Sequence, residues 1–444
     1  MKKKRKKVKC KQDKLLLYFV MMVVIGSLTA AMPVFAKENT SAQAAERASK
    51  YKSGYEDASK FGGPSSVGAE LQEADEVSEP RFLIPGIDCV YKPWFDFKAH
   101  IKRELGLSFS LDYQALYQVL DESPGEDDAA AGLFRFYGEW TLLGRNTGHP
   151  GTLVYKLEHG HRLGTDVSPE DLGFEAGAIL PTGDSFTEFR NSNWAMTNLY
   201  WQQRFLDSHV TFVAGNVDPT DYVDTYGLND PQKHFLNLAF LTNPTIAVPD
   251  QGLGAAFGLM VTDNMYVFSG LSDANGDPTV VGFDTFFDDN EYFKHLEIGW
   301  VSSFDRRFYD NIHLTVWHVD GREKAQVPDS WGLAFSLTRF IDDKWMPFIQ
   351  AGWSDGDASS MEASVSAGIA RYFSKHRDLI GLGVGWGQPS DNSLHDQYTA
   401  ELFYRLYLTQ SLAITPDIQL IIDPALNPDE DVIGVFGLRV RLTF

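Results

Sequence analysis

From Leu105 to the last residue, hydrophobic and polar positions alternate with a period of two. In one such run hydrophobic side chains stand at Leu107, Phe109, Leu111 and Tyr113, with small or polar residues between them. Successive side chains of an extended strand point to opposite faces, so each run predicts a strand with one apolar and one polar face. The runs are about ten residues long, which is the length that a tilted strand needs to cross a bilayer.

The last run, VIGVFGLRVRLTF, alternates strictly. One face is apolar up to the terminal Phe444, and the opposite face carries Arg439 and Arg441. A strand of a soluble sandwich has the same pattern. This run alone therefore leaves open whether its apolar face meets a protein core or lipid.

The connections between the runs alternate in length. Tight polar turns such as VTDNMY and YLTQSL are followed by longer acidic loops such as DESPGEDDAA and DPALNPDED. Short turns at one end and long loops at the other are typical of outer-membrane barrels. Counting the runs gives about seventeen strands, but termini on the same side of the membrane require an even number. We therefore predict an all-β, transmembrane antiparallel barrel of sixteen strands over 105–444, with the doubtful strand between Gly164 and Trp194.

The N-terminus has the three parts of a secretory signal peptide. Residues 1–14 are basic, residues 15–28 are apolar, and small residues at Val34 and Ala36 allow cleavage after Ala36. The sequence therefore predicts a signal peptide over 1–36. An uncleaved anchor helix is the alternative.

Two further segments precede the predicted barrel. Residues 37–80 are rich in Ala, Ser and Glu and almost free of large aliphatic residues, which predicts a disordered or loosely helical extension. Within residues 81–104, the stretch that begins at Pro93 has apolar residues near helical spacing. It predicts a short amphipathic helix in front of the barrel.

The chain is strongly acidic, with a formal net charge of −21. Nine of its 39 Lys and Arg and one of its 60 Asp and Glu lie in the predicted signal peptide, which leaves 30 basic and 59 acidic residues, net −29. This balance argues against nucleic acid as a partner, because phosphates require a positive surface. Of the two cysteines, Cys10 leaves with the signal peptide, so Cys89 has no disulfide partner within the exported chain.

If the apolar faces meet lipid, the polar faces line a pore. Mixed charges, amides and Tyr suit an uncharged, polyhydroxylated solute, because charged groups can bridge neighbouring hydroxyls and aromatic faces accept sugar C–H groups. The alternative is that these residues solvate the wall and pair with one another. The candidates for lining the pore and contacting sugar are Arg135, Tyr137, Glu139, Lys156, Glu158, Tyr200, Gln202, Arg204, Glu401, Arg405, Asp417, Gln419, Arg439 and Arg441.

One connection, between Gly215 and Leu253, is far too long for a turn and is rich in apolar residues. A segment of this composition packs against another surface, and the interior wall is available. We therefore predict that it folds inward and narrows the pore. The candidates that it places at the constriction are Asp218, Asp221, Asp224 or Tyr226, and His234.

No cofactor or metal site is predicted. Asp273, Asn275 and Asp277 resemble the start of a calcium loop, but the Glu that completes such a loop does not follow. His159 and His161 share a strand face without a third ligand in view. No phosphate-binding loop or nucleophile elbow is present.

Three stretches resemble the carbohydrate-selective outer-membrane porins of the OprB type. They are GNVDPTDYVDTYGLNDPQKHF and the residues after it, GLSDANGDP, and the last forty or so residues. The resemblance implies a sixteen-stranded barrel in the outer membrane of a Gram-negative bacterium that passes sugars such as glucose passively. It also implies that Phe444 is read by the barrel-insertion machinery. The expected partners are small carbohydrates and outer-membrane lipids, and the barrel is a monomer or a homo-trimer.

Two other functions remain open. A general or cation-preferring porin of the same fold would suit the acidic balance. A barrel enzyme of the outer membrane, such as a lipid hydrolase, would need Ser and His on the lipid-facing side, and the lipid-facing positions of the runs contain neither. The leading prediction is thus a passive sugar channel without enzymatic activity.

The inward fold of the long connection can be tested by deleting residues 222–234. The deletion should enlarge the single-channel conductance in planar bilayers, because less of the lumen is filled. An unchanged conductance would contradict the inward fold.

Overall fold

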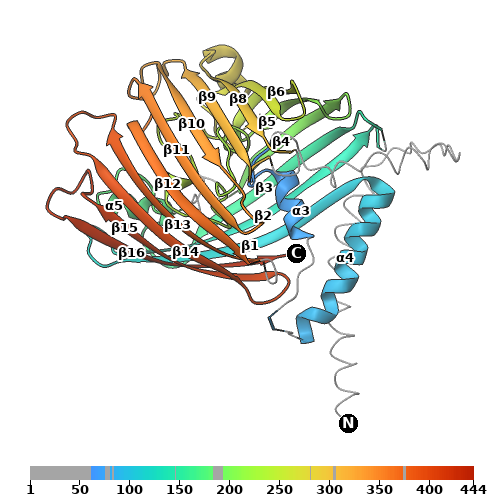
Figure 1. The fold of residues 1–444 in the computed structure, drawn as a ribbon, viewed down its shortest axis with the longest axis horizontal. Coiled ribbons are helices and arrows are strands. Elements are labelled where there is room, and N and C mark those ends of the chain that lie inside the picture. Colours follow the sequence, from blue (N-terminus) through green and yellow to red (C-terminus); the bar gives the residue numbers. More distant parts are fainter. Residues whose placement is uncertain are drawn as a thin grey trace, which may run out of the picture.

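The structure is a computed structural model that describes residues 62–75, 81–82, 85–145, 147–183, 194–280, 282–303, 307–373 and 377–444. Sixteen antiparallel strands form one closed barrel, in which each strand pairs with its neighbours in sequence and β1 closes the ring on β16 (Figure 1). The predicted sixteen-stranded barrel is therefore confirmed. The predicted signal peptide, residues 1–36, and the extension up to residue 61 lie outside the described residues.

The strands lie at nearly regular intervals along the chain. Their bounds are β1 (Leu107–Leu120), β2 (Asp128–Leu143), β3 (Gly151–Arg162), β4 (Trp194–Phe205), β5 (Val210–Val217), β6 (Gly252–Met260), β7 (Met265–Asp273), β8 (Tyr292–Val301), β9 (Asn311–Val319), β10 (Ser330–Thr338), β11 (Trp345–Asp355), β12 (Met361–Phe373), β13 (Asp378–Pro389), β14 (Gln397–Tyr407), β15 (Leu412–Ile422) and β16 (Val432–Thr443).

The doubtful segment between β3 and β4 contains a helix in its described part, α5 (Pro169–Glu175). Leu172 and Ala176 are fully buried in a cluster with Leu120 and Ile433 of the barrel. Pro169 in the first turn favours a helix start and cannot donate to a strand ladder. Because the described part of this segment forms a helix and no strand, the barrel has sixteen strands and not seventeen.

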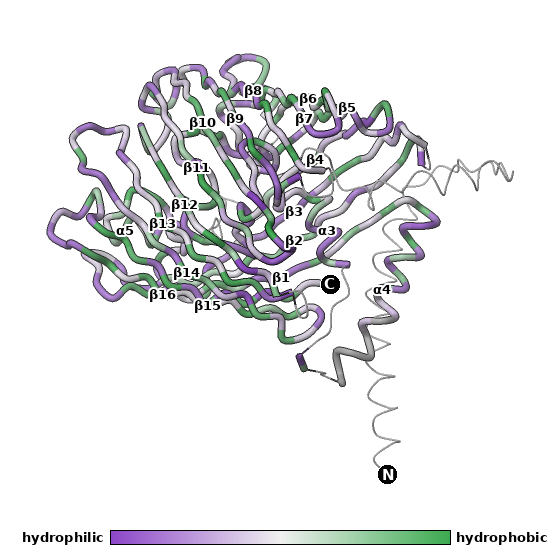
Figure 2. The backbone as a smooth tube through the Cα atoms, in the orientation of Figure 1, coloured by the Kyte–Doolittle hydropathy of each residue, from purple (hydrophilic) through white to green (hydrophobic). Residues whose placement is uncertain are grey.

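Each strand has an outer and an inner face. On β8, Leu296 and Ile298 are exposed, with 44% and 49% of their surface accessible, while His295 and Glu297, which alternate with them, are buried. Hydrophobic and hydrophilic positions are interspersed along the strands of the whole wall (Figure 2). An outward apolar surface with a polar interior is the arrangement that a barrel needs in lipid.

A long helix, α4 (Pro85–Leu105), packs against the outside of the barrel next to β1 (Figure 1). It begins before Pro93, which lies inside the helix rather than at its start. Trp94 lies 5.8 Å from Phe109, ring centre to ring centre, so packing on the outer wall outweighs the hydrogen bond that a proline cannot make. Among the described helices, none is both long and apolar enough to span a membrane.

A short helix, α3 (Val67–Ala74), lies inside the barrel, although its residues belong to the extension that the sequence predicts to be disordered or loosely helical. Val67 and Leu71 are fully buried in one cluster with Tyr137 and Val154 of the inner wall. The sequence shows little apolar area in this segment, and its order comes from the barrel that surrounds it.

The long connection between β5 and β6, residues 218–251, folds into the lumen as predicted, and we call it the inward loop. It contains η1 (Pro219–Asp221) and α6 (Leu238–Leu241). Phe235 of the inward loop is fully buried, and its ring centre lies 4.9 Å from that of Phe403 on β14 and 5.7 Å from that of Phe348 on β11. The apolar residues of the loop thus form a core with the inner wall.

Replacing Phe235 by Ala should lower the free energy of unfolding by about 3 kcal/mol, because a fully buried aromatic ring is removed and a cavity remains. Urea unfolding of the refolded barrel in vesicles measures the change. The matched control is Phe287→Ala, since Phe287 lies in the β7–β8 connection with 62% of its surface exposed and should change the value by less than about 0.5 kcal/mol. Equal effects of the two variants would contradict the role of Phe235.

Candidate functional site

The inward loop is fixed to one side of the barrel by a carboxylate on β14. Glu401 accepts hydrogen bonds from the backbone N–H of Leu236 at 2.6 Å and of Asn237 at 2.9 Å. The side-chain amide of Asn237 in turn donates to the side-chain oxygen of Gln419 on β15 at 2.9 Å. Two predicted sugar contacts, Glu401 and Gln419, therefore hold the loop in the structure.

An arginine on β16 fixes the same part of the loop. Arg439 donates to the carbonyl oxygen of His234 at 2.7 Å and also to that of Pro231. His234 itself is buried. Burial, with Arg405 nearby, holds the pKa of His234 well below its usual range, so this histidine is neutral at physiological pH.

The loop is also fixed to the wall formed by β8 and β9. Asp224 lies 2.8 Å from Nε2 of His313, and its backbone N–H donates to Glu297 at 2.9 Å. Tyr266 donates to the same Glu297 at 2.6 Å. Because the loop is held at β8–β9 and at β14–β16, it spans the lumen and divides it.

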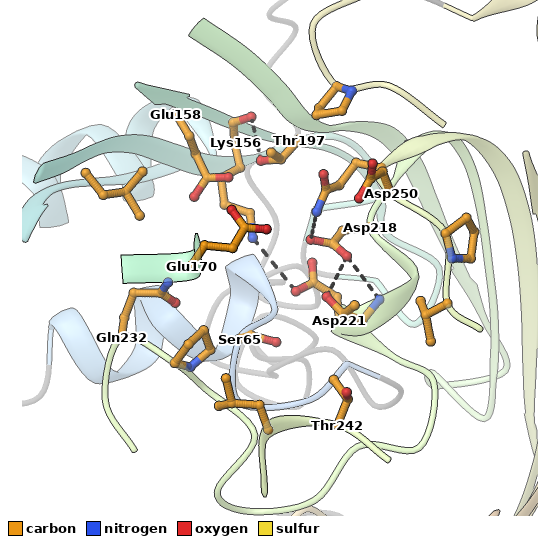
Figure 3. Close-up of a pocket in the computed structure, with 18 of the residues that line it drawn as sticks. Ser65, Lys156, Glu158, Glu170, Thr197, Asp218, Asp221, Gln232, Thr242 and Asp250 are labelled. Carbon is orange, nitrogen blue, oxygen red and sulfur yellow. Dashed lines mark hydrogen bonds and ion pairs between the residues drawn. The ribbon is translucent and has the colours of Figure 1, made fainter. Parts of the chain in front are cut away.

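Beside the loop lies a polar pocket of about 380 Å³. Its wall comes from β2, β3, β4, the inward loop, α5 and the β7–β8 connection. Figure 3 shows carboxylates, amides and hydroxyls directed into the same space. Its polar lining residues are Ser65, Arg135, Lys156, Glu158, Glu170, Thr197, Asp218, Thr220, Asp221, Asn229, Gln232, Thr242, Asp250, Gln251, Asp277 and Thr279.

The described lining of the pocket holds six carboxylates against two cations, and it contains no aromatic residue. The residues that the sequence analysis predicts and that line the pocket are Arg135, Lys156, Glu158, Asp218 and Asp221. Those that lie elsewhere on the wall or loop are Tyr137, Glu139, Tyr200, Gln202, Arg204, Asp224, Tyr226, His234, Glu401, Arg405, Asp417, Gln419, Arg439 and Arg441.

At the centre of the pocket, Lys156 on β3 faces Asp221 of the inward loop at 3.8 Å (Figure 3). Asn198 donates to the same carboxylate at 3.0 Å. Burial raises the pKa of Asp221 to about 8, Lys156 opposes this shift, and the neighbouring Asp218 adds to it. The charge of the pocket therefore changes within the accessible pH range.

Comparison with known proteins identifies the family. Residues 141–444 match the sequence profile described as "Carbohydrate-selective porin, OprB family". The chain belongs to the OprB family of porins. Its fold resembles that of Pseudomonas putida OprB at high pH, with a TM-score of 0.60 and 15% identity over 83% of this chain and 99% of that chain.

Curated relatives of this OprB-family porin include Porin AaxA of Chlamydia abortus, which is 21% identical over 77% of this chain and 78% of the relative. Porin AaxA of Chlamydia pneumoniae is 21% identical over 68% of this chain and 70% of the relative. Family and fold indicate a channel in the outer membrane of a Gram-negative bacterium. In the part of the chain that the structure describes, no group of three potential metal ligands comes together.

Several charged residues in the interior of this OprB-family porin are not among the candidates predicted from the sequence. Asp112 on β1 accepts hydrogen bonds from Arg135 at 2.8 Å and from Arg441 at 2.8 Å, which joins three neighbouring strands. Its polar-face position in β1 is the signal that could have identified it. Glu70 and Glu73 lie in a segment whose composition suggests no packed structure, so the sequence carries no comparable signal for them.

The raised pKa of Asp221 predicts a pH-dependent ion selectivity. As the pH rises past about 8, Asp221 loses its proton and the pocket gains one negative charge. The permeability ratio of K⁺ to Cl⁻ should therefore be about twofold higher at pH 9.5 than at pH 6.5, the scale of one added charge in a water-filled pore. Reversal potentials in a salt gradient measure this ratio.

The Asp221→Asn variant should lose this pH dependence. The control variant, Asp391→Asn, changes an exposed residue of the β13–β14 connection and should keep it. A pH dependence of equal size in both variants would show that Asp221 is not its source.

Proposed function

We propose that this OprB-family porin passes small sugars through the outer membrane by passive diffusion. The observation that carries the proposal is the pocket beside the inward loop. It has a volume of about 380 Å³, and acceptors and donors of hydrogen bonds face one another in it. A hydroxyl both donates and accepts, so carboxylates such as Asp218 and amides such as Gln232 can bind it together. Weak contacts at several points allow a solute to enter and leave.

The lining suggests how a sugar would be recognised. Because the described lining contains no aromatic side chain, the apolar face of a pyranose ring has no stacking partner there. Recognition would rest on hydrogen bonds, which favours hydroxyl-rich solutes over solutes of the same size with fewer hydroxyls.

A second candidate function is a cation-preferring porin, and the excess of carboxylates in the pocket favours it. Of the two cations, Arg135 already pairs with Asp112 and with Glu70 at 2.8 Å. Lys156 faces Asp221, which becomes negatively charged as the pH rises past about 8. Above that pH the positive charges of the pocket are largely compensated, and a positively charged solute would meet a favourable potential.

We also propose that residues 1–36 direct export and that the C-terminal strand is recognised during barrel insertion. The backbone oxygen of Phe444 accepts hydrogen bonds from the Ser110 hydroxyl at 2.6 Å and from the Leu111 N–H at 3.0 Å. The last residue is thereby part of the closing seam between β1 and β16. The assembled barrel is proposed to act as a monomer or homo-trimer among outer-membrane lipids.

One bilayer experiment separates the two candidate functions. Single-channel current is recorded while glucose, maltose or an uncharged non-sugar of similar size is added, and the reversal potential is measured in a salt gradient. A sugar channel predicts saturable block by the sugars alone, weakened several-fold by Gln232→Ala. Current that is insensitive to sugar but carried mainly by K⁺ would reject the sugar proposal in favour of the cation-preferring porin.

A further inference from the structure

Residues 62–75, which comprise α3, the five residues before it and Asp75 after it, lie between the inner wall and the inward loop. The N–H of Gly63 donates to the carbonyl oxygen of Asp221 at 2.6 Å, and Nζ of Lys233 donates to the carbonyl oxygen of Pro64 at 3.2 Å. Ser65 is part of the lining of the pocket (Figure 3). The segment therefore occupies space through which a solute would otherwise pass.

Two carboxylates of α3 hold it there. Glu70, with 1% of its surface exposed, lies 2.8 Å from Arg135 on β2 and 3.9 Å from Arg441 on β16. These two arginines belong to the inner wall and are candidates for solute contact in the sequence analysis. In the structure Glu70 covers them.

One turn further along the helix, Glu73 lies 2.8 Å from Lys233 of the inward loop and 3.5 Å from Arg405 on β14. The hydroxyl of Tyr407 donates to it at 2.9 Å. Burial by itself would raise the pKa of Glu73, but Lys233 and Arg405 hold it well below its usual range. Glu73 is therefore charged at neutral pH and bridges the loop to the wall.

The barrel does not need this segment for its own integrity. The strand ring closes through β1 and β16 without any contribution from α3. Asp112 binds Arg135 and Arg441 whether or not Glu70 is present, and Asp230 lies 2.6 Å from Lys233. Removing α3 would thus leave Arg135 and Arg441 sharing Asp112 and Lys233 paired with Asp230, while Arg405 would lose Glu73 and face the water of the opened lumen.

The apolar contribution to holding the segment is small. Within α3 the large apolar side chains are Val67 and Leu71, which pack on Tyr137 and Val154. Burying two aliphatic side chains offsets only part of the entropy that is lost when residues 62–75 become ordered. The ion pairs of Glu70 and Glu73 are therefore the contacts whose removal should release the segment.

The segment lies at one end of the pore. Arg405 and Tyr407 are at the end of β14, beside the tight turn to β15, and Arg441 is near the end of β16. Tight turns mark the periplasmic end of outer-membrane barrels. The chain also enters β1 at this end, at Leu107, so the segment reaches the lumen from the periplasmic mouth.

We propose that residues 62–75 form a plug. In its place in the structure the plug closes the periplasmic half of the lumen, and when it moves out of the lumen the full pore opens. The plug places Glu70 and Glu73 on the wall cations that a solute with acceptor oxygens would otherwise reach. The proposal depends on the channel role of the barrel and not on which solute passes.

The test is single-channel recording of the exported chain and three variants in planar bilayers. Deleting residues 62–75 should raise the unitary conductance at least twofold and abolish long closures. The double variant Glu70→Ala, Glu73→Ala should switch between the conductance of the unaltered chain and that of the deletion variant. Glu104→Gln is the matched control, because Glu104 is an exposed residue of α4 outside the plug that pairs with its neighbour Arg103 at 3.3 Å, and it should behave like the unaltered chain.

Channels formed by the deletion variant alone would also support the plug, since the unaltered chain would then be closed. Equal conductance and equal closures of the deletion variant and the unaltered chain would overturn it. The proposal would also be overturned if neither the deletion variant nor the unaltered chain formed channels, although heat-modifiable mobility in gels showed that both barrels were folded. Block by sugar is scored separately, so a failure of the sugar proposal leaves this outcome readable.

A labelling experiment covers the case in which the deletion variant does not fold. In a Cys89→Ser background, Leu71→Cys places a single thiol on the fully buried face of α3. A small maleimide should label it at least tenfold faster when Glu73 is also changed to Ala. An unchanged labelling rate would contradict a plug held by its carboxylates.

Discussion

The closed ring of backbone hydrogen bonds is the constraint on which the rest of this porin depends. Lipid offers no partner for an N–H or C=O group, so each strand must pair on both sides, and β1 must meet β16. The seam extends to the last residue, because Phe444 exchanges backbone hydrogen bonds with Leu111. Once the ring is closed, its outer face can be apolar and its inner face is free to carry charges.

That inner face is used mainly to hold other parts of the same chain. Glu401 and Arg439 bind the backbone of the inward loop, and His313 and Glu297 bind Asp224 from the other wall. Glu401, Arg439 and Asp224 each have a hydrogen-bond partner there, as burial requires. The inward loop therefore fills part of the lumen, and the space left for solutes is a pocket beside the loop.

The charges of the interior are divided by position. At the turn end, arginines gather around Asp112 and the plug segment, residues 62–75, whereas carboxylates outnumber cations in the lining of the pocket beside the inward loop. Arg135 belongs to both groups, so a solute in the pocket would meet the carboxylates together with the first of the arginines. This order of charges follows from where β14, β16 and the inward loop meet, and it decides which groups a solute can reach.

The sequence by itself determined the barrel, the even strand number and the inward fold of the loop, because strand alternation and the apolar content of residues 218–251 are local patterns. It also placed polar residues such as Arg135 and Glu401 on the inner face. Which of them meet solvent and which bind the loop was decided by the tertiary structure, since partners such as Glu401 and Leu236 are far apart in the chain. The position of α3 was decided in the same way: its few apolar side chains give no local signal, and its order depends on cations that the closed barrel brings around it.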